Sequence, residues 1–264
     1  MIFLYMLLNI LIWMIFLALG LFVGGKFSRY ATSAAGVGLI IIFSQAFLYF
    51  HPEYEVLIFS SADYVYFRWW SIAGAFLLTG ASADNVSPEN KKAVWFFAAI
   101  SLAAGAYLYN QTIFMACADF NESGFAKGLC IQSTGYTCAP ASCATLLNIY
   151  GVHATEKEMS GLCLTEKRGT NYVKVFRGLK LKLAADDYEV RIEQKKFDEL
   201  KLIPPPFLTS IYIMNGKISH MICVLNASTD EIYFADSLLA EKMTLKKDDF
   251  VKNWDEKVVY IRKN

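Results

Sequence analysis

The chain has very little charge over its first 116 residues. Of 25 basic and 24 acidic residues, only ten precede position 116. The formal net charge of +1 gives no electrostatic reason to bind nucleic acid. The sequence also lacks a glycine-rich phosphate loop and any spacing typical of zinc ligands. We therefore expect no nucleic-acid partner, no metal site and no cofactor.

Four stretches in this charge-poor part are apolar enough to cross a bilayer, which needs about 20 residues each. They are residues 2–24, 31–50, 65–83 and 93–115. The first has no basic start, and its apolar run is longer than the core of a signal peptide, so we expect a retained anchor. Glycine and alanine in the later stretches favour close helix packing. The sequence predicts a transmembrane four-helix domain over residues 1–116, with membrane lipid as a partner.

The few basic residues of this part predict its orientation. Lys26 and Arg29 lie between the first two stretches, and Lys91 and Lys92 lie between the last two. The loop from His51 to Asp63 carries acids but no lysine or arginine. By the positive-inside rule the two basic loops face the cytoplasm. We therefore expect an integral protein of a bacterial inner (cell) membrane, with residues 117–264 on the extracytoplasmic side.

Cys138 is placed where a nucleophilic thiol is expected. The run from Cys138 to Tyr150 predicts a helix, because Pro140 is tolerated in a first turn and Gly151 ends the pattern. The N-terminus of a helix favours the thiolate, the form of cysteine that attacks a carbonyl. Gln132 lies six residues upstream, where its side-chain amide could join the backbone N–H of Cys138 in holding an oxyanion.

A second pair of candidates lies on predicted strands. Alternation and turn residues predict an antiparallel meander over Leu208–Met214, Ile218–Leu225 and Glu231–Ala235. His220 lies on the second strand and Asp236 follows the third, each eight residues from Ser228. A symmetric hairpin would make them direct cross-strand neighbours at about 5 Å between Cβ atoms. A carboxylate there would fix the imidazole tautomer and stabilise the imidazolium.

The rest of the soluble part predicts one α+β domain over residues 117–264. Thr155 and Glu158 form a capping box for a helix that ends near Leu162, and Thr170 can cap a helix over Tyr172 to Leu179. Later segments are expected as a strand at Val190–Glu193 and a helical turn at Phe197–Leu202. Helices thus come first and an antiparallel sheet follows.

The motif residues together resemble the double-glycine-leader, or bacteriocin-processing, cysteine peptidases of the papain-like clan. The resemblance is carried by Gln132, Cys138-Ala-Pro-Ala, Gly169-Thr170, Ser219-His220-Met221 and Asp236, and it covers nearly all of the soluble part. It implies Cys138 as nucleophile, His220 as general base and acid, Asp236 as the residue that orients His220, and Gln132 as oxyanion donor. The expected fold is a membrane bundle of four spans followed by a papain-like α+β peptidase domain.

Two residues depart from that family's pattern. Ala139 stands where the family usually has glycine, and Ser237 stands where it usually has proline. Ala139 is a small change, whereas Ser237 leaves its loop less constrained and could alter how Asp236 is aimed. No nucleotide-binding domain follows the peptidase part of this sequence. We therefore expect a stand-alone membrane peptidase with different substrates.

Three functions are compatible with these residues. The first is a membrane-anchored cysteine endopeptidase that cleaves a peptide or pre-protein near the bilayer through a thioester. The second is a transglutaminase-like acyl transferase, which uses the same three residue types. The third is a catalytically silent receptor whose groove binds a peptide. A peptide or protein partner is common to all three, and the oligomeric state is left open.

The remaining cysteines and histidines receive structural interpretations. All six cysteines lie between Cys117 and Cys223, and Cys223 is expected as a buried thiol on a central strand. An extracytoplasmic domain permits disulfides, and the pairs to test are Cys117 with Cys130 and Cys143 with Cys163. His153 is expected on the surface rather than in the site.

Overall fold

The computed structural model describes residues 2–66, 70–113 and 124–263. The chain forms two compact units. The first comprises Met1–His51 and Asp63–Met115, and the second comprises Pro52–Ala62 and Ala116–Asn264. The segment Pro52–Ala62, which contains helix α3 (Pro52–Ile58), therefore belongs with the C-terminal unit, although the sequence placed it in a loop of the membrane domain.

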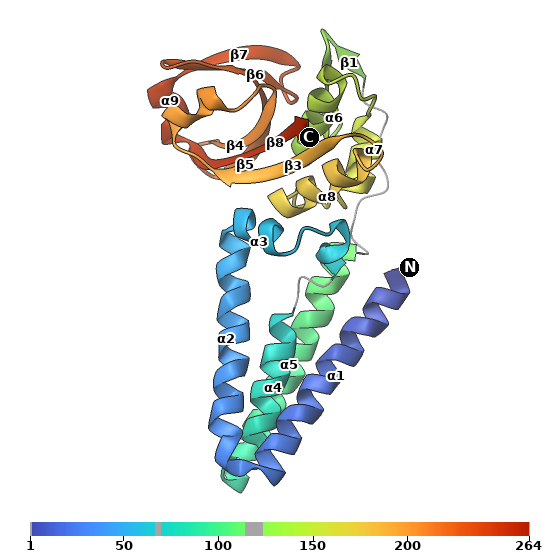
Figure 1. Cartoon of the computed structure of the whole chain (residues 1–264), viewed down its shortest axis with the longest axis vertical. Coiled ribbons are helices and arrows are strands. Elements are labelled where there is room, and N and C mark those ends of the chain that lie inside the picture. The colour runs from blue at the N-terminus through green and yellow to red at the C-terminus, as the bar shows by residue number, and fades with distance from the viewer. Residues whose placement is uncertain (1, 67–69, 114–123, 264) are drawn as a thin grey trace. The chain divides into compact units, whose positions relative to one another are not determined.

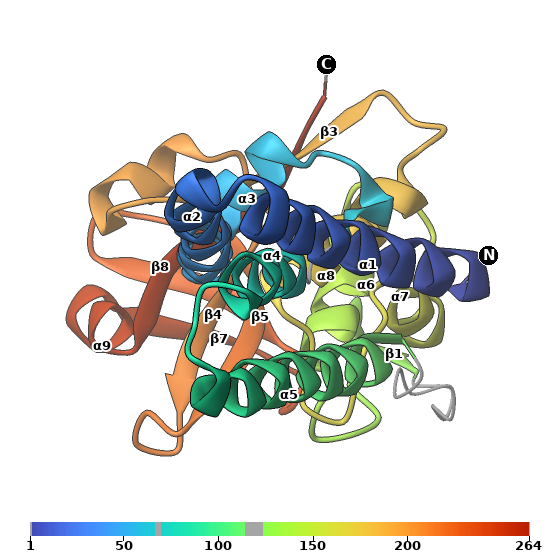
Figure 2. The same cartoon turned by 90° about the horizontal axis from the view of Figure 1, so that it is seen from below.

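The first unit is helical. Its main helices are α1 (Ile2–Lys26), α2 (Ala31–Phe50), α4 (Ser71–Ala83) and α5 (Pro88–Ile113), with short 3-10 turns at Ser28–Tyr30 and Ala62–Tyr66. Helix α4 contacts α1, α2 and α5, and Figure 2 shows it surrounded by the other three. Because most of its residues are buried by these neighbours, α4 is the central helix of the unit.

Glycines allow the backbones of this unit to approach closely, as the sequence predicted. A Cβ on Gly38 of α2 would lie 2.6 Å from the carbonyl oxygen of Gly74 in α4. A Cβ on Gly20 of α1 would lie 2.6 Å from the carbonyl oxygen of Leu77. Real Cβ atoms do not approach backbone oxygens this closely, so only glycine permits these two crossings.

The structure supports two of the four predicted membrane spans. Over the described residues, Leu7–Lys26 and Ser28–Phe50 are long and apolar enough to cross a membrane. The predicted span at 65–83 is not among them: residues 67–69 lie outside the described residues, and the helix described there, α4, has 13 residues. At 1.5 Å per residue this gives about 20 Å, short of a hydrocarbon core of about 30 Å. The predicted span at 93–115 falls on α5, which does not qualify over its described residues, and 114–115 lie outside them.

The second unit carries a six-stranded antiparallel sheet in the order β3-β8-β4-β5-β6-β7. The strands are β3 (Tyr188–Gln194), β4 (Phe207–Ile213), β5 (Ile218–Ala227), β6 (Glu231–Asp236), β7 (Glu241–Lys246) and β8 (Trp254–Lys263). A hairpin of β1 (Phe125–Ala126) and β2 (Leu129–Cys130) precedes them. The predicted meander is confirmed as β4-β5-β6. Its continuation β7 was not predicted: this edge strand is mostly exposed and charged, and only Met243 and Leu245 pack against the core.

The helices of this unit are α6 (Cys138–Ile149), α7 (Glu156–Leu162), α8 (Tyr172–Lys182) and α9 (Lys247–Lys252), with a 3-10 turn at Phe197–Leu202. In Figure 1, α6, α7 and α8 lie together on one side of the sheet and α9 lies on the other. The cap at Thr155 is confirmed, since its side chain accepts from the Glu158 N–H at 3.2 Å. The cap predicted at Thr170 is wrong: Asn171 accepts from the Lys174 N–H at 3.1 Å instead.

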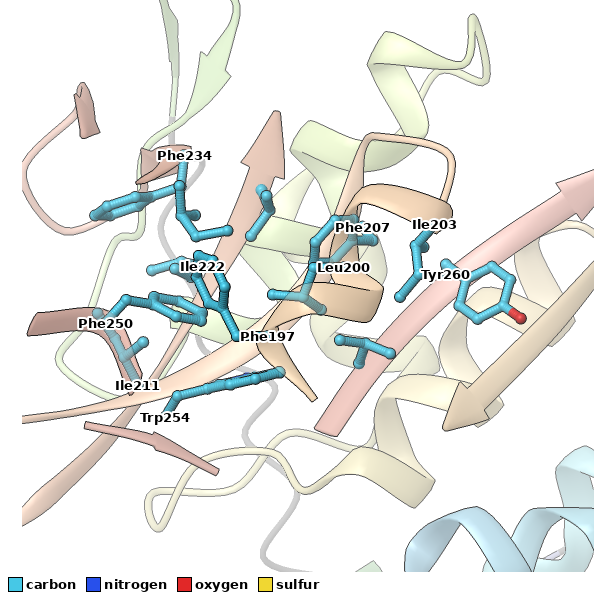
Figure 3. Packing of buried hydrophobic residues seen from close by; sticks show 13 residues of the cluster. Phe197, Leu200, Ile203, Phe207, Ile211, Ile222, Phe234, Phe250, Trp254 and Tyr260 are labelled. Atoms are coloured by element: carbon cyan, nitrogen blue, oxygen red, sulfur yellow. The ribbon is translucent and has the colours of Figure 1, made fainter. Parts of the chain in front are cut away.

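A hydrophobic core lies between the sheet, the 3-10 turn and α9. Thirteen residues form it, including the fully buried Phe207, Ile222 and Phe250, and Figure 3 shows their side chains packed together. On the helical side, the Tyr172 hydroxyl donates to Asp255 at 2.9 Å and accepts from the Ser210 N–H at 3.0 Å. This buried pair of bonds fixes the start of α8 against the sheet.

Candidate active site

Cys138 is the first residue of α6, as predicted. The backbone of Thr137 leaves helical geometry there, and the Ala141 N–H donates to the Thr137 carbonyl at 3.1 Å as the first bond of the helix. The first N–H groups of any helix have no partner within it, so the Cys138 sulfur lies beside the positive end of α6. Cys138 is partly exposed, which leaves its thiol accessible to a substrate.

His220 and Asp236 meet although the sheet register differs from the predicted one. The pairing of β5 with β6 runs Cys223 to Ala235, and it shifts between Val224 and Asn226 where β5 bulges. Continued along the strands, this register sets Asp236 beside Ile222 rather than beside His220. The two side chains therefore meet diagonally on one face of the sheet. His220 Nε2–H donates to Asp236 Oδ1 at 3.0 Å.

The second nitrogen of the imidazole is left for the sulfur. The Cys138 thiol lies close enough to the His220 ring to raise its pKa. Since Nε2 is engaged by Asp236, Nδ1 is the nitrogen left for the sulfur. The three side chains thus form a continuous series from thiol to imidazole to carboxylate, with His220 3% and Asp236 7% exposed.

The surroundings favour the charged forms of His220 and Asp236. Burial by itself would lower the pKa of His220, but its bonds to Asp236 and Cys138 outweigh burial and raise that pKa to about 9. Burial would raise the pKa of Asp236, yet the His220 ring and the Leu238 and Leu239 N–H groups lower it overall. His220 is therefore an imidazolium at neutral pH, paired with a carboxylate.

Buried polar contacts hold α6 against the strand that carries His220. The Ser142 hydroxyl, one turn after Cys138, donates to the Met221 carbonyl at 3.0 Å. Met221 directly follows His220, so this bond ties the nucleophile's helix to the strand of the base. The Cys130 N–H donates to Thr145 Oγ1 at 2.9 Å and joins β2 to the same helix.

Gln132 links the chain before α6 to the turn after β6. Its backbone N–H donates to the Ser237 carbonyl at 3.0 Å, and its side-chain oxygen accepts from the Ser237 hydroxyl at 3.0 Å. Its side-chain nitrogen donates to the Thr134 carbonyl at 2.8 Å. The structure thus brings the segment of Gln132 to the turn that follows Asp236.

Glu156 is a site-supporting residue that the sequence did not reveal. This fully buried carboxylate accepts from the Ser133 N–H at 2.8 Å and from the Ser133 hydroxyl at 3.1 Å. It therefore fixes the residue next to Gln132 from the side of α7. No sequence signal distinguishes Glu156 from the solvated Glu158 two positions later, since both lie in a helical first turn.

The other cysteines are placed in the protein interior. Cys143 and Cys163 are buried thiols that contact one another, so the predicted disulfide between them is absent. Burial, followed by the Cys163 contact, raises the pKa of Cys143 well above its usual value, and burial also raises that of Cys223. Such thiols are poor nucleophiles. Cys117 lies outside the described residues, and its pairing with Cys130 stays a prediction.

His153 is exposed in the loop after α6, as the sequence predicted. Across residues 2–66, 70–113 and 124–263, the described side chains include no group of three or more His, Cys, Asp or Glu that could hold a metal ion.

Comparisons with known proteins cover the C-terminal half of the chain. A sequence profile of the peptidase C39 family matches residues 127–264. An uncharacterized protein of Methanothermobacter marburgensis is 27% identical over 132 residues, which are 50% of this chain and 86% of that protein.

Two solved structures are similar to part of this chain. The peptidase domain of Streptococcus ComA, a bi-functional ABC transporter, is 17% identical with a TM-score of 0.45, over 51% of this chain and 96% of that one. A double glycine motif protease from an AMS/PCAT transporter, in complex with its leader peptide, is 13% identical with a TM-score of 0.45, over 55% of this chain and 95% of that one. Because the profile spans just over half of the sequence, the chain belongs to the peptidase C39 family, and its C-terminal part is a cysteine peptidase domain.

Proposed function

We propose that this protein is a cysteine endopeptidase in which Cys138 is the nucleophile, His220 the general base and acid, and Asp236 the residue that orients His220. The observation that carries the proposal is the position of His220, which pairs with Asp236 at 3.0 Å through Nε2 and lies close enough to the Cys138 thiol to raise the pKa of the ring. This order of thiol, imidazole and carboxylate is the arrangement that nucleophilic catalysis by cysteine requires.

The reaction follows from these positions. The Cys138 thiolate attacks the peptide carbonyl carbon, and its oxygen becomes an oxyanion that the Cys138 N–H and the Gln132 amide stabilise. The C–N bond then breaks while the His220 imidazolium gives its proton to the leaving amine, which leaves a thioester on Cys138. Neutral His220 next takes a proton from water, and the resulting hydroxide attacks the thioester. Release of the carboxylic acid returns the thiolate and the imidazolium.

A peptide with two glycines before the scissile bond is the substrate class that we propose to test first. The motif residues resemble peptidases that cut after such a pair, and the chain belongs to the peptidase C39 family. Acyl transfer to an amine would use the same thioester, and a silent receptor would need none of the triad. Neither alternative is favoured by any contact of the described residues.

We also propose that residues 1–116 anchor the peptidase domain, residues 117–264, in a cell membrane. Two helices are long and apolar enough to cross it, and only 22% and 17% of their apolar windows are buried. Large side chains such as Leu11, Ile15, Ile40 and Phe43 are more than half exposed on these two helices, as expected for side chains that face lipid. The basic residues Lys26 and Arg29, between the two supported spans, support a peptidase domain outside the cytoplasm.

The test of the activity uses the full chain in detergent and a fluorogenic peptide that ends in Gly-Gly. We expect turnover by the native chain and none by Cys138→Ala. Cys143→Ala serves as the matched control, because it removes a buried thiol from the same helix. Isotopically labelled water should enter the new carboxylate, which distinguishes hydrolysis from acyl transfer. Turnover that survives in Cys138→Ala would refute the mechanism.

The test of orientation adds a membrane-impermeant maleimide to intact cells that express variants with Cys138→Ala and one added surface cysteine. We expect labelling at the exposed turn of Ser228 and protection near Lys26. The reverse pattern would place the peptidase domain in the cytoplasm.

A further inference from the structure

Ser237 makes two contacts with the residue that we propose as oxyanion donor. Its hydroxyl donates to Gln132 Oε1 at 3.0 Å, and its carbonyl accepts from the Gln132 N–H at 3.0 Å. Ser237 is 3% exposed, so water does not compete strongly for these groups. The proline that the resembling peptidases usually carry after their aspartate has no hydroxyl and could not donate the first of these bonds.

The contacts of the Gln132 side chain leave it one free donor. A carboxamide has an oxygen that accepts and two N–H groups that donate. The oxygen accepts from Ser237, and one N–H donates to the Thr134 carbonyl at 2.8 Å. A single N–H remains for a substrate. Exchange of the oxygen and nitrogen positions would set the amide oxygen against the Thr134 carbonyl, which can only accept, and would end the donation from the Ser237 hydroxyl. It would also bring the amide oxygen toward a substrate oxyanion.

We propose that Ser237 is a positioning residue that fixes the orientation of the Gln132 carboxamide and thereby presents its remaining N–H to the oxyanion. This inference rests on the proposed peptidase function and deepens it. Ser237 directly follows Asp236, so the same turn holds the carboxylate of the triad and the oxyanion donor. The sequence separates these groups by about a hundred positions, and the two Gln132–Ser237 bonds join them.

A rival role for Ser237 would act through Asp236. The structure favours the first role, because other groups already hold the carboxylate. Asp236 Oδ1 accepts from the Leu238 N–H at 2.8 Å, from the Leu239 N–H at 3.3 Å and from His220 at 3.0 Å. None of these bonds uses the Ser237 side chain. Removal of the hydroxyl should therefore leave the thiol–imidazole–carboxylate series unchanged.

The experiment separates the two roles by using a reaction that forms no oxyanion. Alkylation of Cys138 by iodoacetamide depends on the thiolate alone, whereas cleavage of a Gly-Gly fluorogenic peptide passes through a tetrahedral oxyanion. In the full chain in detergent, we expect Ser237→Ala to lower kcat by about 3- to 10-fold, the loss of one neutral hydrogen bond, with little change in KM. The alkylation rate should equal that of the native chain.

Three further single variants and one double variant test the proposal more closely. Ser237→Thr keeps the hydroxyl and should stay within about twofold of native kcat, since its bond to Gln132 can still form. Ser228→Ala removes a serine hydroxyl from the exposed turn of the same hairpin and should leave kcat unchanged. Gln132→Ala should cost about 100- to 1,000-fold in kcat, and adding Ser237→Ala to it should cost nothing more.

Each outcome bears on one proposal. Four outcomes would each overturn the positioning role. In Ser237→Ala, these are an unchanged kcat or an equal fall in kcat and in the alkylation rate. The others are a Ser237→Thr variant as slow as Ser237→Ala, and a further fall in kcat when Ser237→Ala is added to Gln132→Ala. Failure of the native chain to cleave the peptide would overturn the proposed function, and the inference with it. A native chain that cleaves, with Ser237→Ala equally active, would remove the inference and leave the function standing.

Discussion

Asp236→Asn tests whether the carboxylate sets the charge of His220. The two residues are in direct contact at 3.0 Å, and the pKa of His220 is about 9 against a usual 6.5. Burial by itself lowers this pKa, and Asp236 is the largest of the groups that raise it. An amide of the same size keeps the shape of the site but removes the negative charge. The pKa of His220 should then fall to about 6.5 or below.

The size of the effect depends on pH. The imidazolium is the acid that protonates the leaving amine, and kcat/KM reports ionisation in the free enzyme. With a pKa of about 6.5, only about 3% of the variant would hold the imidazolium at pH 8, which predicts a loss of about 30-fold. At pH 6 most of the variant still carries the proton, so ionisation contributes less than about twofold. The basic limb of the profile should move from about pH 9 toward neutral pH.

The assay is the pH dependence of kcat/KM from pH 5 to 10 with a Gly-Gly fluorogenic peptide. Asp230→Asn is the control, because it makes the same change at an exposed position on the same hairpin. A basic limb that stays near pH 9 in Asp236→Asn would refute the electrostatic role. A loss of equal size at pH 6 and pH 8 would also refute it and would indicate orientation alone.

Three other expectations follow from buried groups. Iodoacetamide should modify Cys138 in the folded chain and leave the buried thiols of Cys143, Cys163 and Cys223 unmodified until denaturant is added. Peptide mapping measures this, and rapid labelling of the three buried thiols in the native chain would contradict the expectation. Because the folded pKa of His220 is raised, its contribution to stability is complete below pH 6.5 and is lost as pH rises through about 9. Tm should therefore fall over that range, and His220→Ala should lack this part of the fall. Gly74→Leu should lower the thermal stability of the helical unit by forcing α4 away from α2, whereas Gly36→Leu, which meets open space, should have a small effect in the same scan.

Short-range sequence signals determine several of the helices and strands of this protein. The first turn at Cys138 was predictable because proline, alanine and the following glycine are signals within one helix. The strands β4, β5 and β6 were predictable because each is a short run rich in apolar residues with turn residues at its ends. These signals placed Cys138 and His220 on the correct types of element, whereas Asp236, expected just after a strand, is the last residue of β6.

Tertiary structure decided how those elements meet. The hairpin turn pairs Ala227 with Ile232, so it is centred beyond Ser228, and a bulge in β5 after Val224 then sets Asp236 beside Ile222. The predicted direct pairing of His220 and Asp236 thereby becomes a diagonal one. Helix α4 was predicted as a span from its apolar composition, yet it has 13 residues and is buried by its neighbours, a property that composition cannot distinguish from burial in lipid. Glu156 and Ser237 gained their contacts with the segment of Gln132 only when chain positions far apart were packed together. The sequence determined the reacting groups because their reactivity depends on local residue type and helix position. The fold determined their distances, their charge states and the orientation of the Gln132 amide, because each of these depends on partners that are distant in the chain.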